Sequence, residues 1–431
     1  MRYLLLVFIS SFIISCGTDS PLEFKDLEEN DSVIVINMNM HNVQNNTTPT
    51  TINNNVLNQL NDIRINSGMI ALTNNSNLNS SAYNHAYYLN INHQVGHYES
   101  SSDQNFTGIK PVDRTIEVGY KSKMVSENLS VGQETEDSSL KGLMSAIYHR
   151  FGFLDFDINT IGYSDVNVTY VYNMGNSDLN NLCEGNSFEE IGSYYINTCA
   201  DSSFKIEASV YENELNKTIN ANPTYVIYPY NNEKNVTTSF YEETPDPLPS
   251  YDVSGYPISI EFNSNEYNMS KFSVNNFIIK NENDLLLELA VDYEDGNSIL
   301  SGANDINNHI SNYQFAIFPK NRLDFDSNYT VEFSYTYDGE SRNITWGFKT
   351  EKLDNFIQYN NTDLNLDTNT KYYIYIPPVN ENDIYNRFSI SCSYSSTAAS
   401  PIYNIDFYDQ NTISLKISGE EISSCSMQLK K

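Results

Sequence analysis

The period of the apolar residues changes along this chain of 431 residues, and that change constrains the fold more than any other feature. Between about residues 52 and 155, apolar side chains recur every three or four positions, which is the spacing of an amphipathic helix. After Gly152 they alternate in short stretches, as in β-strands, and beyond Asn222 only strand-like stretches follow. This order predicts an α+β fold, with helices around a small sheet first and all-β units afterwards.

Three helices and two strands are expected in the first unit. The helices follow from amphipathic periodicity and from Ser and Gly residues at their ends. The strands follow from alternation and from β-branched and aromatic side chains. In order, we expect a helix that ends at Ser67-Gly68, a helix capped by Ser80-Ser81, a helix from Ser138-Ser139 into His149-Arg150, and strands over residues 160–163 and 166–172.

The second half of the chain consists of strand-like stretches separated by turn residues. Their spacing is typical of an antiparallel sandwich, and the proline-rich segment Pro245–Pro249 forms a stiff approach to it. Beyond residue 352, a last β-rich unit forms a small domain of its own or extends the sandwich. The strands expected in the sandwich cover residues 225–229, 258–262, 285–291, 315–319, 329–333 and 346–350.

The charge of the chain excludes one class of function. Acidic residues number 55 against 24 basic residues, which gives a formal net charge of −31. Nucleic-acid binding requires clustered Lys and Arg that displace counterions from phosphates, so we expect no nucleic-acid partner. The same charge disfavours docking on anionic lipid, and its plainest effect is solubility through self-repulsion.

The N-terminus has the pattern of an export signal. Met1-Arg2 precedes an apolar run from Tyr3 to Ile14, which is too short for the ~20 residues that span a bilayer. Ile13-Ile14-Ser15-Cys16 resembles the bacterial lipobox, in which the cysteine becomes the lipidated first residue. We therefore expect an exported protein anchored through Cys16 to the cell envelope, at the outer membrane or the cell surface. An ordinary signal peptide with an incidental cysteine is the alternative.

The four remaining cysteines form two pairs that are close in sequence. Cys183 and Cys199 lie within one expected domain, and Cys392 and Cys425 within another. Export to an oxidising compartment predicts two local disulfides, and closing a loop of about 15 residues contributes roughly 3 kcal/mol in the entropic model.

These observations divide the chain into five expected parts. They are a lipoprotein signal peptide (1–16), a flexible tether (17–50), an α+β domain with Cys183 and Cys199 in its C-terminal part (51–220), a β-sandwich (221–351) and a C-terminal β domain with Cys392 and Cys425 (352–431).

The histidines are concentrated in one segment. Of six in the chain, His85, His93, His97 and His149 fall between residues 85 and 149, and Glu127 lies in an extended stretch between them. Two imidazoles and a carboxylate can bind a divalent metal or act as a base with an orienting partner, so we expect His97, Glu127 and His149 to share a polar cleft. The helix C-terminus expected at His149 would raise its pKa. Covalent catalysis has no candidate, because no Ser or Cys stands in a nucleophile motif.

Four further polar residues are expected to support this cleft. Glu99 follows His97 closely, and Asp113 and Arg114 form a local ion pair or hold a loop. Asn128 is most simply a turn or cap residue.

Several motifs in this segment occur in the order of a known family. After Leu57–Arg64, Leu78 and Ala82, they are His97-Tyr98-Glu99, Phe106-Thr107-Gly108, Pro111–Arg114, Ser126-Glu127-Asn128, His149-Arg150 and Ile161-Gly162. Over residues 50 to about 180 the chain resembles the bacterial branch of the CAP superfamily, which includes cysteine-rich secretory and pathogenesis-related proteins. The resemblance implies an α-β-α sandwich around a cleft whose two histidines and two glutamates can bind a divalent cation.

The resemblance assigns roles to particular residues. His97 matches the first cleft histidine, Glu127 matches the glutamate of the Glu-Asn motif, and His149 is the candidate for the second histidine. A divalent cation, Zn²⁺ or Ca²⁺/Mg²⁺, would then be held by His97 and His149. The second glutamate that the wider family places on the third helix is replaced within Leu143–Ala146, so the set of four is predicted to be incomplete.

The downstream sandwich has a resemblance of its own. Ala316–Pro319, Leu323, Tyr329–Val331 and Phe348–Thr350 are similar to the end of a bacterial Ig-like domain. The predicted order is therefore a CAP-type sandwich, an Ig-like sandwich and a small C-terminal β domain.

Three functions are compatible with this architecture. The first is a lipid-anchored envelope protein whose cleft binds an extracytoplasmic ligand, which is a lipid, glycan or protein. The second is a metal-assisted hydrolase or peptidase that uses His97, Glu127 and His149. The third is a purely structural envelope or adhesion protein.

Overall fold

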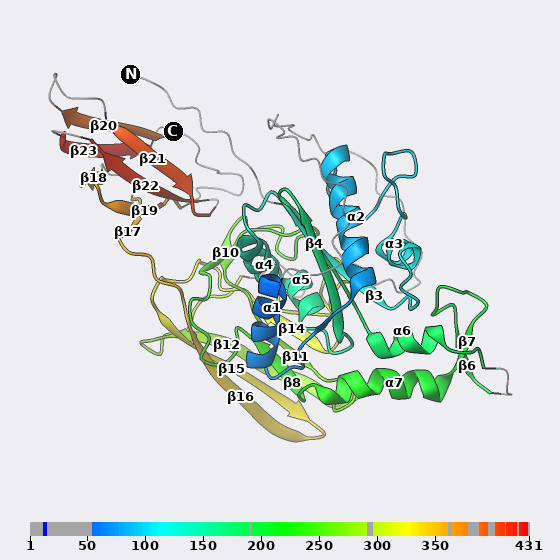
Figure 1. The fold of residues 1–431 in the computed structure, drawn as a ribbon. Coiled ribbons are helices and arrows are strands. Elements are labelled where there is room, and N and C mark those ends of the chain that lie inside the picture. The colour runs from blue at the N-terminus through cyan, green and yellow to red at the C-terminus, as the bar shows by residue number, and fades with distance from the viewer. Residues whose placement is uncertain are drawn as a thin grey trace.

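The computed structural model describes most of the chain beyond the N-terminal region (Figure 1). Cys16 and the expected tether lie outside the described residues, and of the expected signal peptide only Phe12–Ile14 is described, as strand β1. The described residues are 12–14, 54–188, 192–290, 296–360, 364–377, 388–394, 401–409, 411–419 and 422–429.

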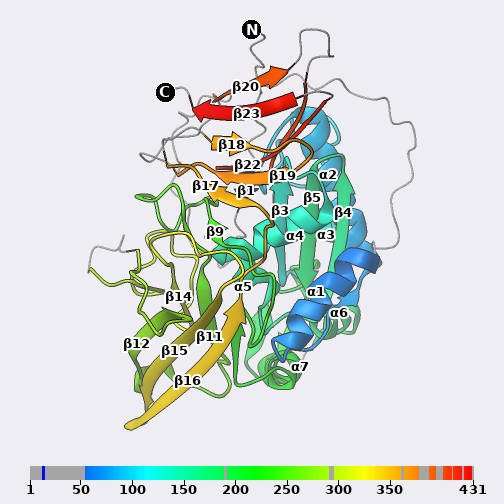
Figure 2. The ribbon, with the colours of Figure 1, turned by 90° about the vertical axis from the view of Figure 1, so that its left-hand side faces the viewer.

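Helices cover both faces of the first sheet, whose strand order is β1-β3-β5-β4-β2 (Figures 1 and 2). On one face, Ala82, Ala86 and Leu89 of α2 pack against Leu129 and Val171. The other face packs against α1, α4 and α5. This α-β-α arrangement confirms the predicted α+β class. The elements are α1 (Asn54–Asn66), β2 (Thr73–Asn74), α2 (Ser76–Asn92), α3 (Pro111–Glu117), β3 (Val125–Val131), α4 (Glu136–Ser145), α5 (Ile147–Phe153), β4 (Thr160–Val166) and β5 (Thr169–Gly175).

Two of the expected helix limits are wrong. Helix α2 begins at Ser76, because the side chain of Asn75 accepts hydrogen bonds from Asn77 N and Leu78 N and caps it there. The expected third helix is two helices. Ala146 adopts φ −76° and ψ 119°, an extended conformation that separates α4 from α5. His149 is therefore the third residue of α5 and does not lie at a helix C-terminus.

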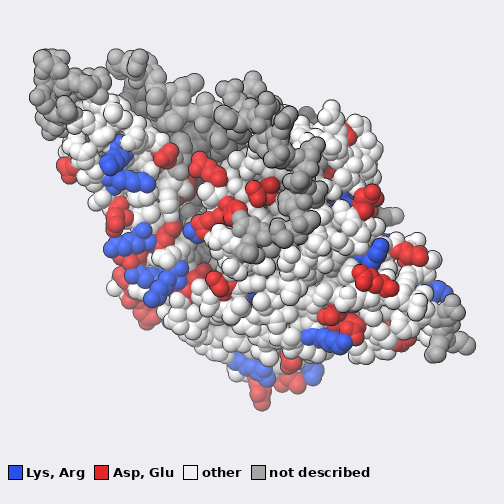
Figure 3. All heavy atoms as spheres, viewed as in Figure 1, with Lys and Arg blue, Asp and Glu red and all other residues white. Residues whose placement is uncertain are grey.

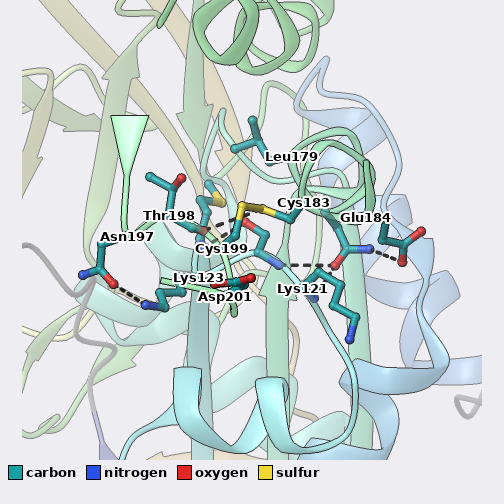
Figure 4. Close-up of a disulfide and its surroundings, with 12 residues drawn as sticks. Lys121, Lys123, Leu179, Cys183, Glu184, Asn197, Thr198, Cys199 and Asp201 are labelled. Carbon is teal, nitrogen blue, oxygen red and sulfur yellow. Dashed lines mark hydrogen bonds between the residues drawn. A yellow bond between two sulfur atoms is a disulfide. The ribbon is translucent and has the colours of Figure 1, made fainter. Parts of the chain in front are cut away.

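A disulfide-linked arm follows the first sheet (Figure 4). It contains α6 (Ser177–Glu184), the hairpin of β6 (Tyr194–Ile196) and β7 (Lys205–Glu207), and α7 (Ala208–Ala221). Cys183 and Cys199 are bonded as predicted. Backbone hydrogen bonds from Lys123 N to Thr198 O and from Ala200 N to Lys121 O hold the arm to the segment that precedes β3.

Two sheets form the β-sandwich that follows. Their orders are β13-β14-β11-β8 and β12-β15-β16. Strand β12 was not predicted, and within the described part of the expected strand 285–291 only isolated bridges form, at Leu286 and Leu289. The strands are β8 (Tyr225–Tyr228), β9 (Ser239–Phe240), β10 (Ser254–Gly255), β11 (Ile258–Phe262), β12 (Phe272–Asn281, after the 3-10 turn Met269–Lys271), β13 (Ile299–Ser301), β14 (Gln314–Ile317), β15 (Asn328–Tyr337) and β16 (Glu340–Lys349).

The α-β-α sandwich and the β-sandwich share one apolar core. A single cluster of buried side chains extends from Val56 and Leu60 of α1 to Trp346 and Phe348 of β16. Arg150 is fully buried at this junction, where it donates to Pro257 O (2.7 Å) and stacks over the rings of Tyr228 and Tyr256. The two units are therefore packed as one body around α5.

The C-terminal part has its own core and two small sheets, β17-β19-β22-β21 and β18-β23-β20. Cys392 and Cys425 are bonded, as predicted, between β20 and β23. On the face shown in Figure 3, acidic and basic side chains are interspersed. The strands are β17 (Phe356–Gln358), β18 (Leu364–Leu366), β19 (Lys371–Tyr375), β20 (Phe388–Tyr394), β21 (Ile402–Phe407), β22 (Thr412–Ser418) and β23 (Ile422–Leu429).

Candidate functional site

Glu127 is at the centre of the polar cleft. It lies on β3 with 1% of its surface exposed, and Arg114 Nη2 on α3 donates to both of its carboxylate oxygens at 2.8 Å. His97, in the loop after α2, contacts Glu127 Oε1 through Nδ1 at 3.0 Å. Burial alone would raise the pKa of Glu127, but Arg114, His85 and His97 together lower it to about 2. The carboxylate is thus held ionised in the interior.

A second buried pair supports the first. His85 Nδ1 on α2 lies 2.9 Å from Glu99 Oε1, and His85 Nε2 lies 2.9 Å from Gly96 O. Glu99 also accepts from Thr107 N at 2.7 Å. These contacts fix the loop that carries His97 from both of its sides, so the position of the His97 imidazole is set by buried hydrogen bonds.

His149 has a carboxylate partner from a distant part of the sequence. Its Nδ1 lies 3.0 Å from Oε2 of Glu243, which follows β9. Both side chains are fully buried. Oε1 of Glu243 also accepts from Ile147 N at 2.6 Å, at the start of α5. The carboxylate therefore holds both the first turn of the helix and the imidazole that the helix carries.

Three imidazoles interact in this cleft. The pKa of His149 is lowered well below its usual value, first by burial and then by His97 and His309. This corrects the raised pKa expected from a helix C-terminus, because burial disfavours the imidazolium. The Nε2 atoms of His97 and His149 are both buried without a hydrogen-bond partner. The side chain of His97 is 11% exposed and His309 lies at the surface, so the cleft reaches solvent there.

The loop that carries Asp305, Asn307 and His309 is held against α5 by Tyr148. The Tyr148 hydroxyl donates to Asp305 Oδ1 at 2.6 Å, and the amide of Asn307 donates back to it at 3.0 Å. The rings of Tyr148 and His309 lie 5.2 Å apart. A loop of the β-sandwich therefore brings His309 next to Tyr148, the neighbour of His149 on α5.

Comparison with known proteins identifies the first of these units. Residues 57–175 match the model of the cysteine-rich secretory protein family, CAP. The chain contains a CAP domain. No curated protein matches the chain.

Two solved structures similar to the CAP domain come from bacteria. One is an extracellular protein with an SCP domain from Bacillus anthracis, with 17% identity and a TM-score of 0.27 over 28% of this chain and 39% of that chain. The match therefore spans less than half of that protein. The other is an outer surface protein of Borrelia burgdorferi, with 16% identity and a TM-score of 0.26 over 28% of this chain and 90% of that chain.

Two expectations for the CAP cleft need correction. Of the two alternatives for Asp113 and Arg114, the local ion pair is wrong, because Arg114 pairs with Glu127 while Asp113 Oδ2 accepts from Lys110 N at the start of α3. The other alternative is confirmed, because Arg114 Nη1 donates to His97 O at 2.8 Å and so holds the loop after α2. Asn128 lies within β3, where its amide donates to His149 O at 2.8 Å, and is not a turn residue. Residues 143–146 carry no carboxylate, and the carboxylate beside His149 belongs to Glu243.

Four residues of the site were not predicted as such. The first is His85, which the sequence marked only as one of the histidines of this segment. The second is Asn173 on β5, whose side-chain amide is oriented so that it donates to Glu127 Oε2 at 2.9 Å. The i,i+4 and i,i+7 spacing of His85 from Ser81 and Leu78, on the buried face of α2, could have indicated His85. Glu243 and His309 reach the cleft only through packing of the β-sandwich, and no local pattern marks them.

Two imidazole nitrogens of the CAP cleft, His97 Nε2 and His149 Nε2, have no hydrogen-bond partner and could accept a cation. Both glutamates are engaged, Glu127 by Arg114 and Glu243 by backbone N–H groups. Among the described residues, no group of three or more His, Cys, Asp or Glu side chains is arranged to hold a metal ion. His97 Nε2 and His149 Nε2 would bind it, with solvent or ligand atoms completing the coordination, and the ion would act as a Lewis acid toward a bound ligand.

Proposed function

We propose that this protein is an exported, lipid-anchored envelope protein whose CAP cleft binds an extracytoplasmic ligand. One observation carries the proposal: His97 Nε2 and His149 Nε2 are buried and have no partner in the described part of the chain. A buried polar atom without a partner costs about 1–3 kcal/mol, so a ligand that engages these atoms recovers that energy. The exposed edge of His97 gives such a ligand access.

Two further features support export. Both disulfides belong to an oxidising compartment, and the family of the CAP domain is described as secretory. Among the described helices, none has the length and apolar composition needed to cross a bilayer. An anchor at Cys16 would attach the protein to the envelope.

Ligand binding is tested with three classes of probe. Wild-type protein, His97→Ala and His93→Asn are applied to vesicles of phosphatidylcholine and phosphatidylglycerol, to a glycan array and to purified envelope proteins. We expect wild-type protein to retain one class and His97→Ala to lose at least tenfold in affinity. His93 is an exposed histidine four residues away, so His93→Asn is the matched control. The proposal fails if no class is retained or if His97→Ala binds as well as wild type.

The hydrolase alternative uses the same side chains and is an outcome of the same series. Peptide and peptidoglycan hydrolysis is measured with wild type, His97→Ala and Glu127→Gln. Turnover that both substitutions abolish would replace the binding proposal with a catalytic one.

The lipid anchor is tested separately. Cells expressing the full chain or its Cys16→Ala variant are labelled with radioactive palmitate and fractionated. We expect label and membrane association in the wild type only. Equal labelling of both forms would contradict an anchor at Cys16.

A further inference from the structure

Exposed apolar side chains lie beside the exposed edge of His97. Val95 and Tyr98, on either side of it in the sequence, have 44% and 54% of their surface exposed, and Ile109 has 52%. Glu99 N donates to Ile109 O at 3.0 Å, so the segment that ends at Tyr98 and the segment of Ile109 lie side by side. Single exposed apolar side chains are common on proteins, but several that gather at a cleft mark an interaction site.

A fourth exposed apolar side chain comes from the β-sandwich part. Ile306 is 52% exposed and follows Asp305, which accepts a hydrogen bond from the Tyr148 hydroxyl of α5 at 2.6 Å. His309 lies in the same loop. Its pKa is lowered by burial and by His97, against the effect of Asp305, so the two imidazoles are close enough for their charges to interact. The apolar residues around His97 therefore belong to both packed units.

We call Val95, Tyr98, Ile109 and Ile306 the apolar rim. The charged side chains that reach solvent in the segments around it, residues 93–117, 241–252 and 303–312, are nearly all acidic. The acidic ones are Asp103, Asp113, Glu117, Glu242, Asp246 and Asp252, and the one lysine or arginine is Lys110. A surface of this kind attracts a basic partner and repels a bilayer of anionic lipid.

We propose, on the basis of the binding role given to the cleft, that the apolar rim docks an extended segment of a partner protein in which apolar side chains stand between basic ones. Tyrosine and buried apolar anchors carry most of the affinity of protein interfaces, and opposite charges around them determine partner choice and association rate. A glycan presents mainly hydroxyl groups and would leave the two isoleucines of the rim without an apolar counterpart.

The proposal is tested first with three synthetic peptides of about ten residues, which span roughly 35 Å when extended. One has a leucine–tyrosine–leucine centre between lysines, the second replaces that centre by serines, and the third replaces the lysines by aspartates. Fluorescence anisotropy measures their binding to the full chain. We expect the first peptide alone to bind, and its affinity to fall at least about tenfold between about 0.05 and about 0.5 M NaCl, because salt screens exposed charges. No binding of the first peptide, or equal binding of all three, overturns the proposal.

Two variants then remove one rim residue from each unit. They are Tyr98→Ser in the CAP domain and Ile306→Ser in the β-sandwich, and the matched control is Ile196→Ser, whose side chain is 64% exposed on β6 of the disulfide-linked arm. We expect each rim variant to bind the first peptide at least about tenfold more weakly, and the control to bind it as wild type does. All three side chains are exposed, so the variants should keep the wild-type midpoint of thermal unfolding. Wild-type affinity in either rim variant overturns the proposal.

Photo-cross-linking locates the peptide on the wild-type protein. The first peptide carries benzoylphenylalanine in place of its tyrosine, and mass spectrometry maps the products. We expect cross-links within residues 95–109 and 303–310. Cross-links confined to other segments overturn the proposal.

The outcomes separate this docking surface from the binding role of the imidazoles. Peptide binding that is lost in the rim variants but survives in His97→Ala would keep the docking surface and remove His97 from the proposed function. Vesicle or glycan binding that requires His97 but not the rim would keep the proposed function and overturn the docking of a protein segment.

Discussion

At the scale of single residues, the cleft contains a buried ion pair between Arg114 and Glu127. Arg114 and Glu127 are both inaccessible to solvent, and their paired hydrogen bonds at 2.8 Å set the floor of the cleft. Arg114 Nη1 also donates to His97 O at 2.8 Å. A buried pair of this kind adds little net stability, but removal of one partner leaves the other charge without compensation.

Replacement of Arg114 by methionine should therefore destabilise the protein. We expect a loss of about 3–5 kcal/mol at pH 7 in urea unfolding, because Glu127 is left buried and unpaired. The pKa of Glu127 is depressed to about 2, so its stabilisation is present above its usual value near 4.5 and is lost as the pH falls toward 2. The loss in Arg114→Met should accordingly shrink below pH 4. Lys141→Met, which removes an exposed ion pair on α4, should change stability by less than 1 kcal/mol.

A second prediction concerns the acidic turn after α5. Burial, and then the neighbouring Asp155, raises the pKa of Asp157 to about 7. The sign is opposite to that of Glu127: stability is fully present below the unfolded value near 3.8 and is lost as the pH rises through about 7. Asp157→Asn should thus match wild type near pH 3.5 and exceed it by the order of 2 kcal/mol at pH 8. Equal stability of the two proteins at pH 8 would contradict this, and the exposed Asp62→Asn serves as control.

At the scale of elements, close contact between α2 and β4 orders the CAP sandwich. Gly162 on β4 has no room for a side chain, because an added Cβ would lie 2.1 Å from Leu78 C and 2.2 Å from Asn79 N on α2. The side chain of Asn79 in turn accepts from Tyr163 N. Since α2 also carries His85, this contact places one of the histidines that support the cleft.

Gly162→Ala should prevent α2 from docking on the sheet. The clash is with backbone atoms, which cannot rotate away, so we expect a loss of more than 3 kcal/mol, or a protein that is not recovered in folded form. Gly192→Ala is the control, because the nearest atom to its added Cβ lies 3.9 Å away. Calorimetry of both variants measures the difference, and a Gly162→Ala protein as stable as wild type would show that α2 can shift.

At the scale of the whole molecule, α5 joins the CAP domain to the β-sandwich. Arg150 donates to Met144 O at 2.7 Å within the CAP domain and to Pro257 O and Ser259 Oγ in the sandwich part. Glu243 and Asp305, which also follow the CAP domain in sequence, accept hydrogen bonds from Ile147 N and the Tyr148 hydroxyl of α5. The cleft therefore depends on how the two units pack, and not on the CAP domain alone.

Arg150→Met should weaken this junction. The substitution leaves Met144 O and Pro257 O without their hydrogen-bond donor and removes the cation–π contacts with Tyr228 and Tyr256. We therefore expect the free energy of unfolding to fall by at least about 3 kcal/mol. One apolar core spans both units, so residues 54–350 of the wild-type protein should unfold in a single calorimetric transition. The midpoint temperature of that transition should be lower in Arg150→Met. Lys217→Met, which removes an exposed ion pair on α7, should leave that midpoint within experimental error. A midpoint unchanged in Arg150→Met would contradict the role given to the junction.

Local sequence determined much of the fold and half of the cleft. The helical period, strand alternation and turn residues are properties of neighbouring residues, so α1, β4, β5 and most sandwich strands were predictable, as were both disulfides. His97 and Glu127 were found by the same means, since their motifs are local. The start of α2 was misplaced because Asn75 competes with Ser80-Ser81 as a cap, and the sequence alone does not rank them.

Tertiary structure decided what contacts these residues. The break at Ala146 moved His149 from an expected helix end into a buried position, which reversed the direction of its pKa shift. Glu243 lies 94 positions after His149 in the sequence, and His309 lies 212 positions after His97. Both reach the cleft through packing of the β-sandwich against α5. Burial and long-range contact are properties of the packed chain, and for this reason the second carboxylate of the cleft was absent from the sequence motif but present in the fold.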